Sequence, residues 1–129
     1  MKQTLLQEKY PIFVAEIGKT ETGHTTIEAL VDHYKARIAE NPKVQFIGVF
    51  DHHAHTRRIG GQIAEGIDAA VDIVFCFGHA IPDPRVLAVR PRAIGIADMG
   101  DRFVVSFMEA PMPVANDAMK AWTHALCEA

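Results

Sequence analysis

The chain has 129 residues, of which 49% are hydrophobic and 22% charged, and its formal net charge at pH 7 is −3. This length suits one hydrophobic core, so we expect a single domain over residues 1–129 that is stable without disulfides or a structural metal. The composition is that of a globular protein and excludes wholesale disorder. A weakly acidic chain offers no basic face, so nucleic acid is not an expected partner.

Membrane and secretory signals are absent from the sequence pattern. No apolar run approaches the ~20 residues that a bilayer span requires, and the first residues lack the apolar core of a signal peptide. The only cysteines, Cys76 and Cys127, are far apart and outside any C-x-x-C pattern. We therefore expect a cytoplasmic protein with reduced thiols and no membrane contact.

The first part of the chain predicts a strand, a helix and a second strand. Residues 12–17 are rich in β-forming side chains. Thr25 and Glu28 have the spacing of a capping box, and apolar residues at helical spacing follow until Asn41-Pro42 ends the helix. Residues 44–50 are apolar on both alternating faces, so we expect both faces of that strand to be covered.

The middle of the chain is broken by turn signals. Gly60-Gly61 and Gly66 predict a loop or a short helix. Residues 70–77 predict another strand that is covered on both sides. The segment 82–87 begins with Pro-Asp-Pro and can form one helical turn, because proline is accepted in a first turn.

The last part of the chain predicts a hairpin and a helix. Residues 93–97 and 102–108 form the two strands, and Gly100 supplies the positive φ that such a turn needs. Asn116 is the expected cap of the last helix, and Trp122 is the side chain expected to anchor it to the core.

The resulting element order is β-α-β-β-β-β-α. Two helices against a mostly antiparallel sheet of four or five strands make an α+β two-layer sandwich, with both helices on one face. Several strands are apolar on both faces, yet two helices cover only one. The uncovered face is therefore a candidate dimer surface or ligand floor.

Three segments resemble a known family. Residues 46–52, F-I-G-V-F-D-H, resemble the strand ending in an I-D-H-like motif of the domain of unknown function 302 family. Residues 73–79, I-V-F-C-F-G-H, are similar to its strand ending in F-G-N-P, and residues 103–111 to its strand ending in V-S-Y-N-D-P. The resemblance implies a compact sandwich that is often a dimer, and it supplies no established activity.

The chain also departs from that pattern. His79-Ala80 stands where the family has Asn-Pro, and Glu109-Ala110-Pro111 replaces Asn-Asp-Pro. The family's longer helix before the hairpin is compressed into residues 82–91. These departures place the chain in a divergent subfamily of its own.

The most concentrated polar chemistry is the run Asp51–Arg58, D-H-H-A-H-T-R-R. If the preceding strand continues, Asp51, His53 and His55 share one face and His52 points the other way. Two histidines and a carboxylate on one face can hold a divalent metal, the one cofactor that the sequence suggests. The alternative is a strand end with a solvated polar edge, since metal sites usually draw ligands from more than one element.

The same run also favours a small anionic ligand. Arg57 and Arg58 follow the histidines, and guanidinium groups bind carboxylate or phosphate in a bidentate manner. The expected ligand-binding set is His52, His53, His55, Arg57 and Arg58. A second cluster, Arg85, Arg90 and Arg92, lies in a proline-rich loop, where a solvated role is favoured over a binding role.

A thiol and an imidazole are the catalytic candidates. Cys76 precedes His79 by three residues, and the pair would form a minimal nucleophile and base if both line a cavity. A buried, inert thiol is the favoured alternative. The helix positions of His33 and His124 predict surface residues.

Three functions therefore remain open. The leading hypothesis is a homodimeric cytoplasmic binding module that holds a small anionic or metal-linked ligand at the His/Arg-rich strand end. The second is a small enzyme that uses Cys76 and His79, or a metal held by Asp51, His53 and His55. The third is a structural or interaction protein that uses the uncovered sheet face.

Overall fold

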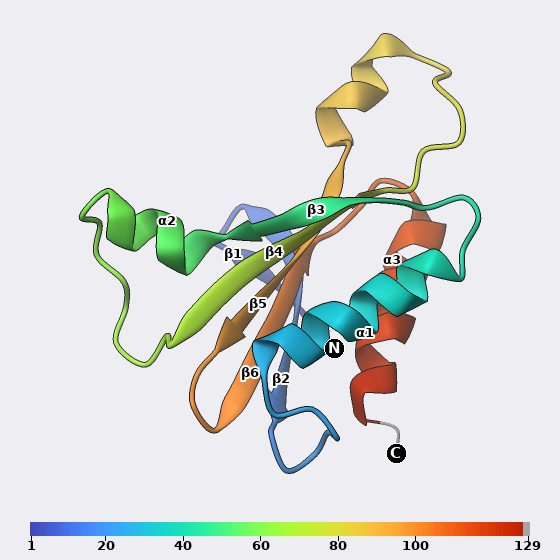
Figure 1. Ribbon diagram of the computed structural model, residues 1–129. Coiled ribbons are helices and arrows are strands. Elements are labelled where there is room, and N and C mark those ends of the chain that lie inside the picture. Colours follow the sequence, from blue (N-terminus) through green and yellow to red (C-terminus); the bar gives the residue numbers. More distant parts are fainter. Residues whose placement is uncertain (128–129) are drawn as a thin grey trace.

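A single antiparallel sheet of six strands forms the centre of the fold in the computed structural model, which describes residues 1–127 (Figure 1). In space the strands follow the order β1-β2-β6-β5-β4-β3. In the chain they are β1 (Lys2–Leu6), β2 (Tyr10–Gly18), β3 (Gln45–Asp51), β4 (Ala69–Cys76), β5 (Arg92–Asp98) and β6 (Arg102–Met108). The predicted α+β sandwich is confirmed.

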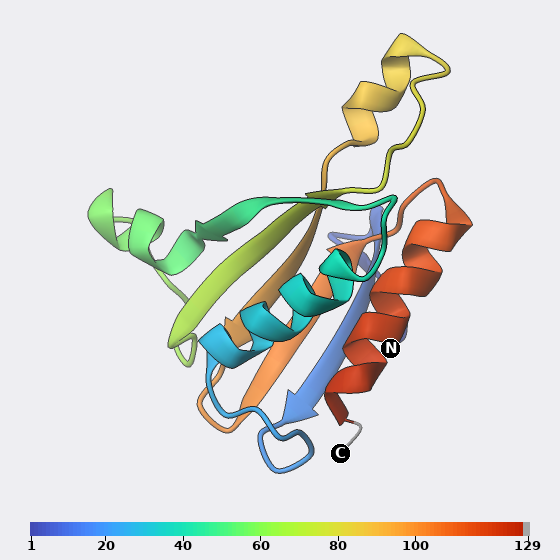
Figure 2. The same cartoon turned by 45° about the vertical axis from the view of Figure 1, so that its right-hand side comes forward.

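Two helices cover one face of the sheet. These are α1 (Ile27–Ala39) and α3 (Pro113–His124), which lie together on the same side in both views (Figures 1 and 2). A short helix, α2 (His52–Arg58), extends from the end of β3. The segment between β4 and β5 projects from the sheet as an arm that contains the 3-10 helix η1 (Pro84–Val89), and η2 (Ala125–Cys127) follows α3. Among residues 1–127, no helix has the length and apolar character that a bilayer crossing needs.

The hydrophobic core lies between the sheet and the two helices. Alternate side chains of the four central strands point into it, because successive residues of a strand face opposite sides. From the sheet the fully buried side chains include Ile73, Phe75, Ile94, Phe103 and Val105. Helices α1 and α3 contribute Leu30, Tyr34, Ile38 and Met119, and η2 contributes Leu126.

The last helix is held by its tryptophan, as predicted. Trp122 is 8% exposed, its ring stacks on Phe77 with a centroid distance of 5.6 Å, and it meets Phe75 edge-on at 5.5 Å. Such aromatic contacts orient a helix on the sheet in addition to burying area.

The sheet has more strands than the sequence predicted, because β1 pairs with β2. All five residues of β1 are exposed. Its sequence, K-Q-T-L-L, also has no alternation of apolar and polar side chains that would identify a strand. Its turn places Gln7 at φ 53° and Glu8 at φ 63°, without the glycine or asparagine that favours this conformation.

Within a single chain, the expectation that both faces of β3 and β4 are covered is not met. β3 is an edge strand, and its Ile47, Val49 and Phe50 are 55%, 43% and 44% exposed. β4 is buried on the helical face only. An apolar run of this kind can therefore reflect an open face as well as a buried strand.

The predicted helix starts need two corrections. α1 is capped by Thr26, whose side chain accepts a hydrogen bond from the Ala29 N–H, and not by Thr25. α3 begins at Pro113, and Asn116 lies inside the helix, where it is buried. By contrast, the hairpin of β5 and β6 with Gly100 at φ 93° and the turn of η1 are confirmed.

Candidate functional site

The histidine-rich run does not continue β3. The strand ends at Asp51 and α2 begins at His52, so the predicted alternation of Asp51, His53 and His55 on one face is wrong. Asp51 is the N-cap of α2, and its Oδ1 accepts a hydrogen bond of 2.8 Å from the Ala54 N–H. Aspartate is a strong N-cap residue, which explains why the chain turns into a helix at this point.

The side chains of α2 diverge around the helix. His52 and His53 border a hollow of about 200 Å³ whose lining includes no arginine. His55 faces Phe50 at a ring distance of 5.4 Å, its Nδ1 lies 2.9 Å from Arg58 Nη2, and Arg57 is exposed. The predicted anion-binding set is therefore not gathered in one pocket.

The metal prediction has a similar outcome. Within residues 1–127, no group of three or more histidine, cysteine and carboxylate side chains is placed to hold a metal ion. Asp51, His53 and His55 thus do not form the facial arrangement that such a site needs.

The two catalytic candidates lie on opposite sides of the sheet. Cys76 alternates with the buried Phe75 and Phe77, so its side chain is on the face of the sheet that no helix covers, which we call the open face. Phe77 points into the core. The Gly78 N–H donates to Cys76 Sγ at 3.3 Å. His79 is exposed and borders a hollow beside Phe77 and Met112, which is on the helical side. No hydrogen bond joins Cys76 and His79 within the described residues.

The side chains of His52 and Asp72 meet on the open face of the sheet, the face that no helix covers. His52 Nε2 is 2.9 Å from Asp72 Oδ2, and the His52 ring meets Phe50 edge-on at 4.7 Å. Asp72 lies in the middle of β4 and its side chain is 32% exposed. Sequence analysis missed Asp72, although a lone carboxylate within an apolar strand is a signal that could have identified it.

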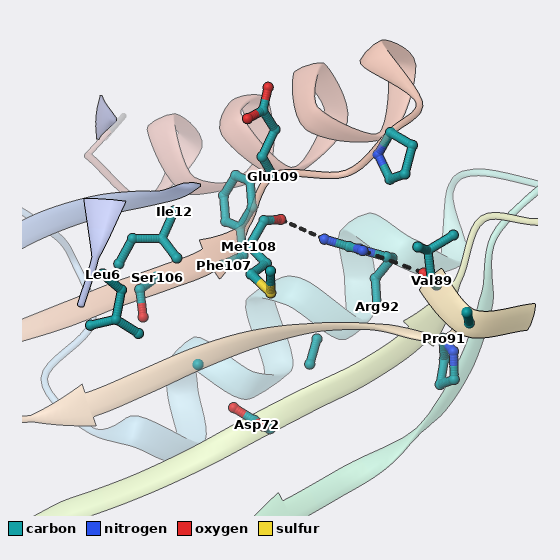
Figure 3. Close-up of a pocket in the computed structure, with 14 residues that line it drawn as sticks. Leu6, Ile12, Asp72, Val89, Pro91, Arg92, Ser106, Phe107, Met108 and Glu109 are labelled. Carbon is teal, nitrogen blue, oxygen red and sulfur yellow. Dashed lines mark hydrogen bonds between the residues drawn. The ribbon is translucent and has the colours of Figure 1, made fainter. Parts of the chain in front are cut away.

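A trough of about 670 Å³ runs over the open face beside Asp72 (Figure 3). Leu6 and Ile12 form one wall, and Val89 with Pro91 forms the other. The floor is made of small residues, since Gly95 lies between Asp72 and Ser106 in the strand register. A Cβ at Gly95 would lie 3.1 Å from Asp72 Oδ1, so a larger residue there would press on this carboxylate.

Arg92 closes one end of the trough. Its Nη2 donates to the Met108 carbonyl at 2.6 Å and its Nη1 to the Val89 carbonyl at 3.3 Å (Figure 3). Nε is buried without a hydrogen-bond partner. Burial lowers the pKa of the Arg92 guanidinium. The group nevertheless stays charged at pH 7, because arginine does not deprotonate in proteins.

A second pocket of about 390 Å³ lies on the other side of Arg92. Arg90 lines it as well, and its Nη1 donates to the Ala80 carbonyl at 2.7 Å. The remaining lining is apolar: Phe77, Val86, Val89, Ala110, Pro111, Met112, Pro113 and Ala115. We call this cavity the arginine pocket. The third member of the predicted cluster, Arg85, is 89% exposed and pairs with Asp83, as expected for a solvated residue.

The sequence comparisons bear on the family alone. The chain matches the model of a family of unknown function (DUF6858) over residues 1–128. The match confirms a domain of unknown function but does not confirm the resemblance to the domain of unknown function 302 family. Comparison with curated proteins and with solved structures gives no match. The chain therefore belongs to the family of unknown function DUF6858.

Proposed function

We propose that the protein is a non-catalytic, homodimeric binding protein in which the open face of the sheet packs on the same face of a second copy. The observation that supports this proposal is the self-complementarity of the open face. Most closed homodimers have a two-fold axis, and such an interface must match itself in shape and charge.

The shape of the open face fits a two-fold axis that runs parallel to the strands between β5 and β6. Rotation about this axis places β6 of one copy over β5 of the other. On the open face β6 carries Met108 and Val104 with Ser106 between them, while β5 carries only Ala93, Gly95 and Ala97. Met108 and Val104 would thus face alanines, and Ser106 would face Gly95, which lets two sheets interdigitate at about 10 Å.

The charges fit the same axis. One row of the register crosses all six strands in the order Lys2, Val14, Ser106, Gly95, Asp72 and Phe50. Rotation brings Lys2 of one copy over Phe50 of the other, beside Asp72. In the next row, Glu16, which pairs with Arg102 of its own chain, would face Ala70, which borders His52. Lys2 of one copy thus lies near Asp72 of the other, and Glu16 lies near His52, which is the arrangement that electrostatic complementarity favours.

The open face is also apolar to a degree that favours a partner. Leu6, Tyr10 and Met108 lie together on the open side of the neighbouring strands β1, β2 and β6 and are 50%, 46% and 49% exposed. Phe50, at the opposite edge of the same face, is 44% exposed. Contiguous exposed apolar surface on a small protein marks an interaction site more often than scattered single residues do.

The test is the mass of the protein in solution, measured by light scattering after size exclusion. We expect the wild-type chain to show twice its monomer mass of 14.2 kDa. Ser106→Arg places a long cation at the centre of the face and should give a folded monomer. Val114→Lys is the matched control, since Val114 is 60% exposed on α3 and away from the open face, and it should remain dimeric.

A charge exchange tests the orientation of the copies. Lys2→Glu and Asp72→Lys should each weaken the dimer, and the double variant should restore it, because the exchanged charges attract again across the two-fold axis. A monomeric wild-type chain would overturn the proposal. A dimer that Ser106→Arg leaves intact would place the interface elsewhere.

A further inference from the structure

We infer that the arginine pocket binds a small organic monocarboxylate with an apolar body, such as an aryl or branched alkyl acid. This inference deepens the proposed binding function, since it names the site and the class of ligand, and it does not depend on the dimer. The pocket lies between the base of the arm and the start of α3, and none of the residues named for the dimer contact lines it.

The charge of the pocket is the first argument. Arg90 and Arg92 are both half-buried, and their hydrogen bonds go only to backbone carbonyl groups. Three other arginines have carboxylate partners: Arg37 pairs with Glu40, Arg85 with Asp83, and Arg102 with Glu16 and Asp101. No acidic residue lines the arginine pocket, and within residues 1–127 neither Arg90 nor Arg92 forms an ion pair.

Two neighbouring cations without a counter-ion make the pocket receptive to an anion. Partial burial removes water from the guanidinium groups, and their repulsion is uncompensated by the protein. A carboxylate that enters the pocket gains charge-assisted hydrogen bonds from both groups. Arg92 is already fixed by the Met108 carbonyl, so little of its freedom is lost on binding.

The position of Arg90 is built into the backbone. Its guanidinium lies directly against Gly78, where an added Cβ would lie 2.6 Å from Arg90 Cζ. Only glycine at residue 78 leaves this place free. The close approach holds Arg90 at the base of the arm, on the same pocket as Arg92.

The walls decide between a carboxylate and a phosphate. Phosphate sites usually add several backbone N–H donors, often from the start of a helix. Here Pro111 and Pro113 have no N–H, and the Ala110 N–H already donates to Asn116 Oδ1 at 2.8 Å. The rest of the wall is aliphatic, aromatic and thioether surface, which favours an apolar body over a second charge.

The volume sets the size of the ligand. A pocket of about 390 Å³ is at the lower end of the range for small-molecule sites, roughly 300 to 1,000 Å³. Phe77 forms part of the wall and is held from behind by its stack on Trp122, while Met112 is flexible enough to follow the shape of the ligand.

Calorimetric titration of the whole chain tests the inference. The probes are two carboxylates, phenylacetate and 4-methylpentanoate. Phenylacetamide is the control that has the apolar body without the charge, and inorganic phosphate is the control that has the charge without the apolar body. We expect at least one carboxylate to bind, and phenylacetamide and phosphate to bind at least about tenfold more weakly, because a hydrogen bond to a charged group is worth that factor or more.

Variants assign the site. Arg90→Gln should weaken carboxylate binding at least about tenfold, and Gly78→Ala should weaken it too, because the new methyl group displaces the Arg90 guanidinium. Arg85→Gln is the matched control from the same arm and should bind as the wild type does. Neither Arg90 nor Arg85 is buried in the core, and Gly78 does not have the positive φ that requires glycine, so all three variants should fold.

Several results would overturn the inference. These are no binding by either carboxylate, equal binding of phosphate, or unchanged affinity in Arg90→Gln. The Ser106→Arg variant separates this inference from the dimer proposal. It should bind carboxylate with the wild-type affinity whatever its oligomeric state, and loss of binding in a folded Ser106→Arg monomer would place the ligand in the open-face trough instead.

Discussion

His33 Nε2 lies 2.8 Å from the carbonyl oxygen of Trp122, so a side chain of α1 is hydrogen-bonded to the backbone of α3. The ring is half-buried between the helices, and its prediction as a surface residue is wrong. Burial lowers the pKa of His33 below its usual 6.5, and the nearby Arg37 lowers it further. The hydrogen bond to Trp122 acts in the opposite direction but does not outweigh burial.

This lowered pKa predicts a loss of stability in mild acid. The unfolded chain binds a proton at His33 near pH 6.5, whereas the folded chain resists it. The free energy of unfolding should therefore fall as the pH decreases from 6.5 towards the lowered pKa of the folded state, and level off below it. Urea unfolding across this pH range measures the effect.

Two variants isolate the contribution of His33. His33→Gln keeps a side-chain N–H near the Trp122 carbonyl but does not titrate, so its stability should fall less in acid than that of the wild type. His124→Gln removes an exposed histidine of α3 and should leave the pH dependence unchanged. Identical pH profiles for the wild type and His33→Gln would contradict the prediction.

A buried hydroxyl pair joins the same two helices at Tyr34 and Thr123. The Tyr34 hydroxyl lies 2.9 Å from Thr123 Oγ1, which in turn donates to the Met119 carbonyl at 2.8 Å. Tyr34→Phe should lower the free energy of unfolding by about 1 kcal/mol, because it removes one hydrogen bond. Thr123→Val should cost more, roughly 1 to 3 kcal/mol, since it leaves the buried Tyr34 hydroxyl without a partner. Chemical denaturation of both variants tests this order, and the reverse order would contradict it.

Asn116 holds the turn that leads from β6 into α3. Its Oδ1 accepts from the Ala110 N–H at 2.8 Å, and its Nδ2 donates to the Ala110 carbonyl at 3.0 Å. Asn116→Ala should lower the free energy of unfolding by roughly 2 to 3 kcal/mol, because two buried backbone groups lose their partner. Asn116→Asp should also destabilise the fold, since a carboxylate cannot donate to the Ala110 carbonyl. An Asn116→Ala variant as stable as the wild type in thermal unfolding would show that water replaces the side chain.

The sequence pattern was sufficient to predict those elements whose stability comes from residues close together in the chain. The hairpin of β5 and β6 follows from strand-forming residues around Gly100, and α1 follows from its helical spacing of apolar residues. The pattern failed where pairing supplies the stability, since β1 has no apolar alternation and is held by its register with β2. It also failed at Asn116, where a residue typical of a helix cap serves a buried turn.

The candidate site depended on contacts that sequence spacing does not encode. Arg90 and Arg92 share a pocket because Gly78 admits one guanidinium and the Met108 carbonyl fixes the other. His52 and Asp72 are distant in the chain and meet only because β3 and β4 pair. The histidine run attracted attention by composition, but a helix distributes its side chains around an axis.

The start of α2 gives a last prediction, on the role of Asp51. As the N-cap, Asp51 should stabilise this short helix by about 1 kcal/mol through its bond to the Ala54 N–H. Asp51→Ala should therefore speed hydrogen exchange of the α2 amides, while Asp51→Asn should preserve the cap because asparagine is an equally good N-cap. If Asp51 instead holds a metal with His53 and His55, metal analysis of the purified protein would find the ion. Asp51→Asn would then lose it, which is the opposite of what a capping role predicts.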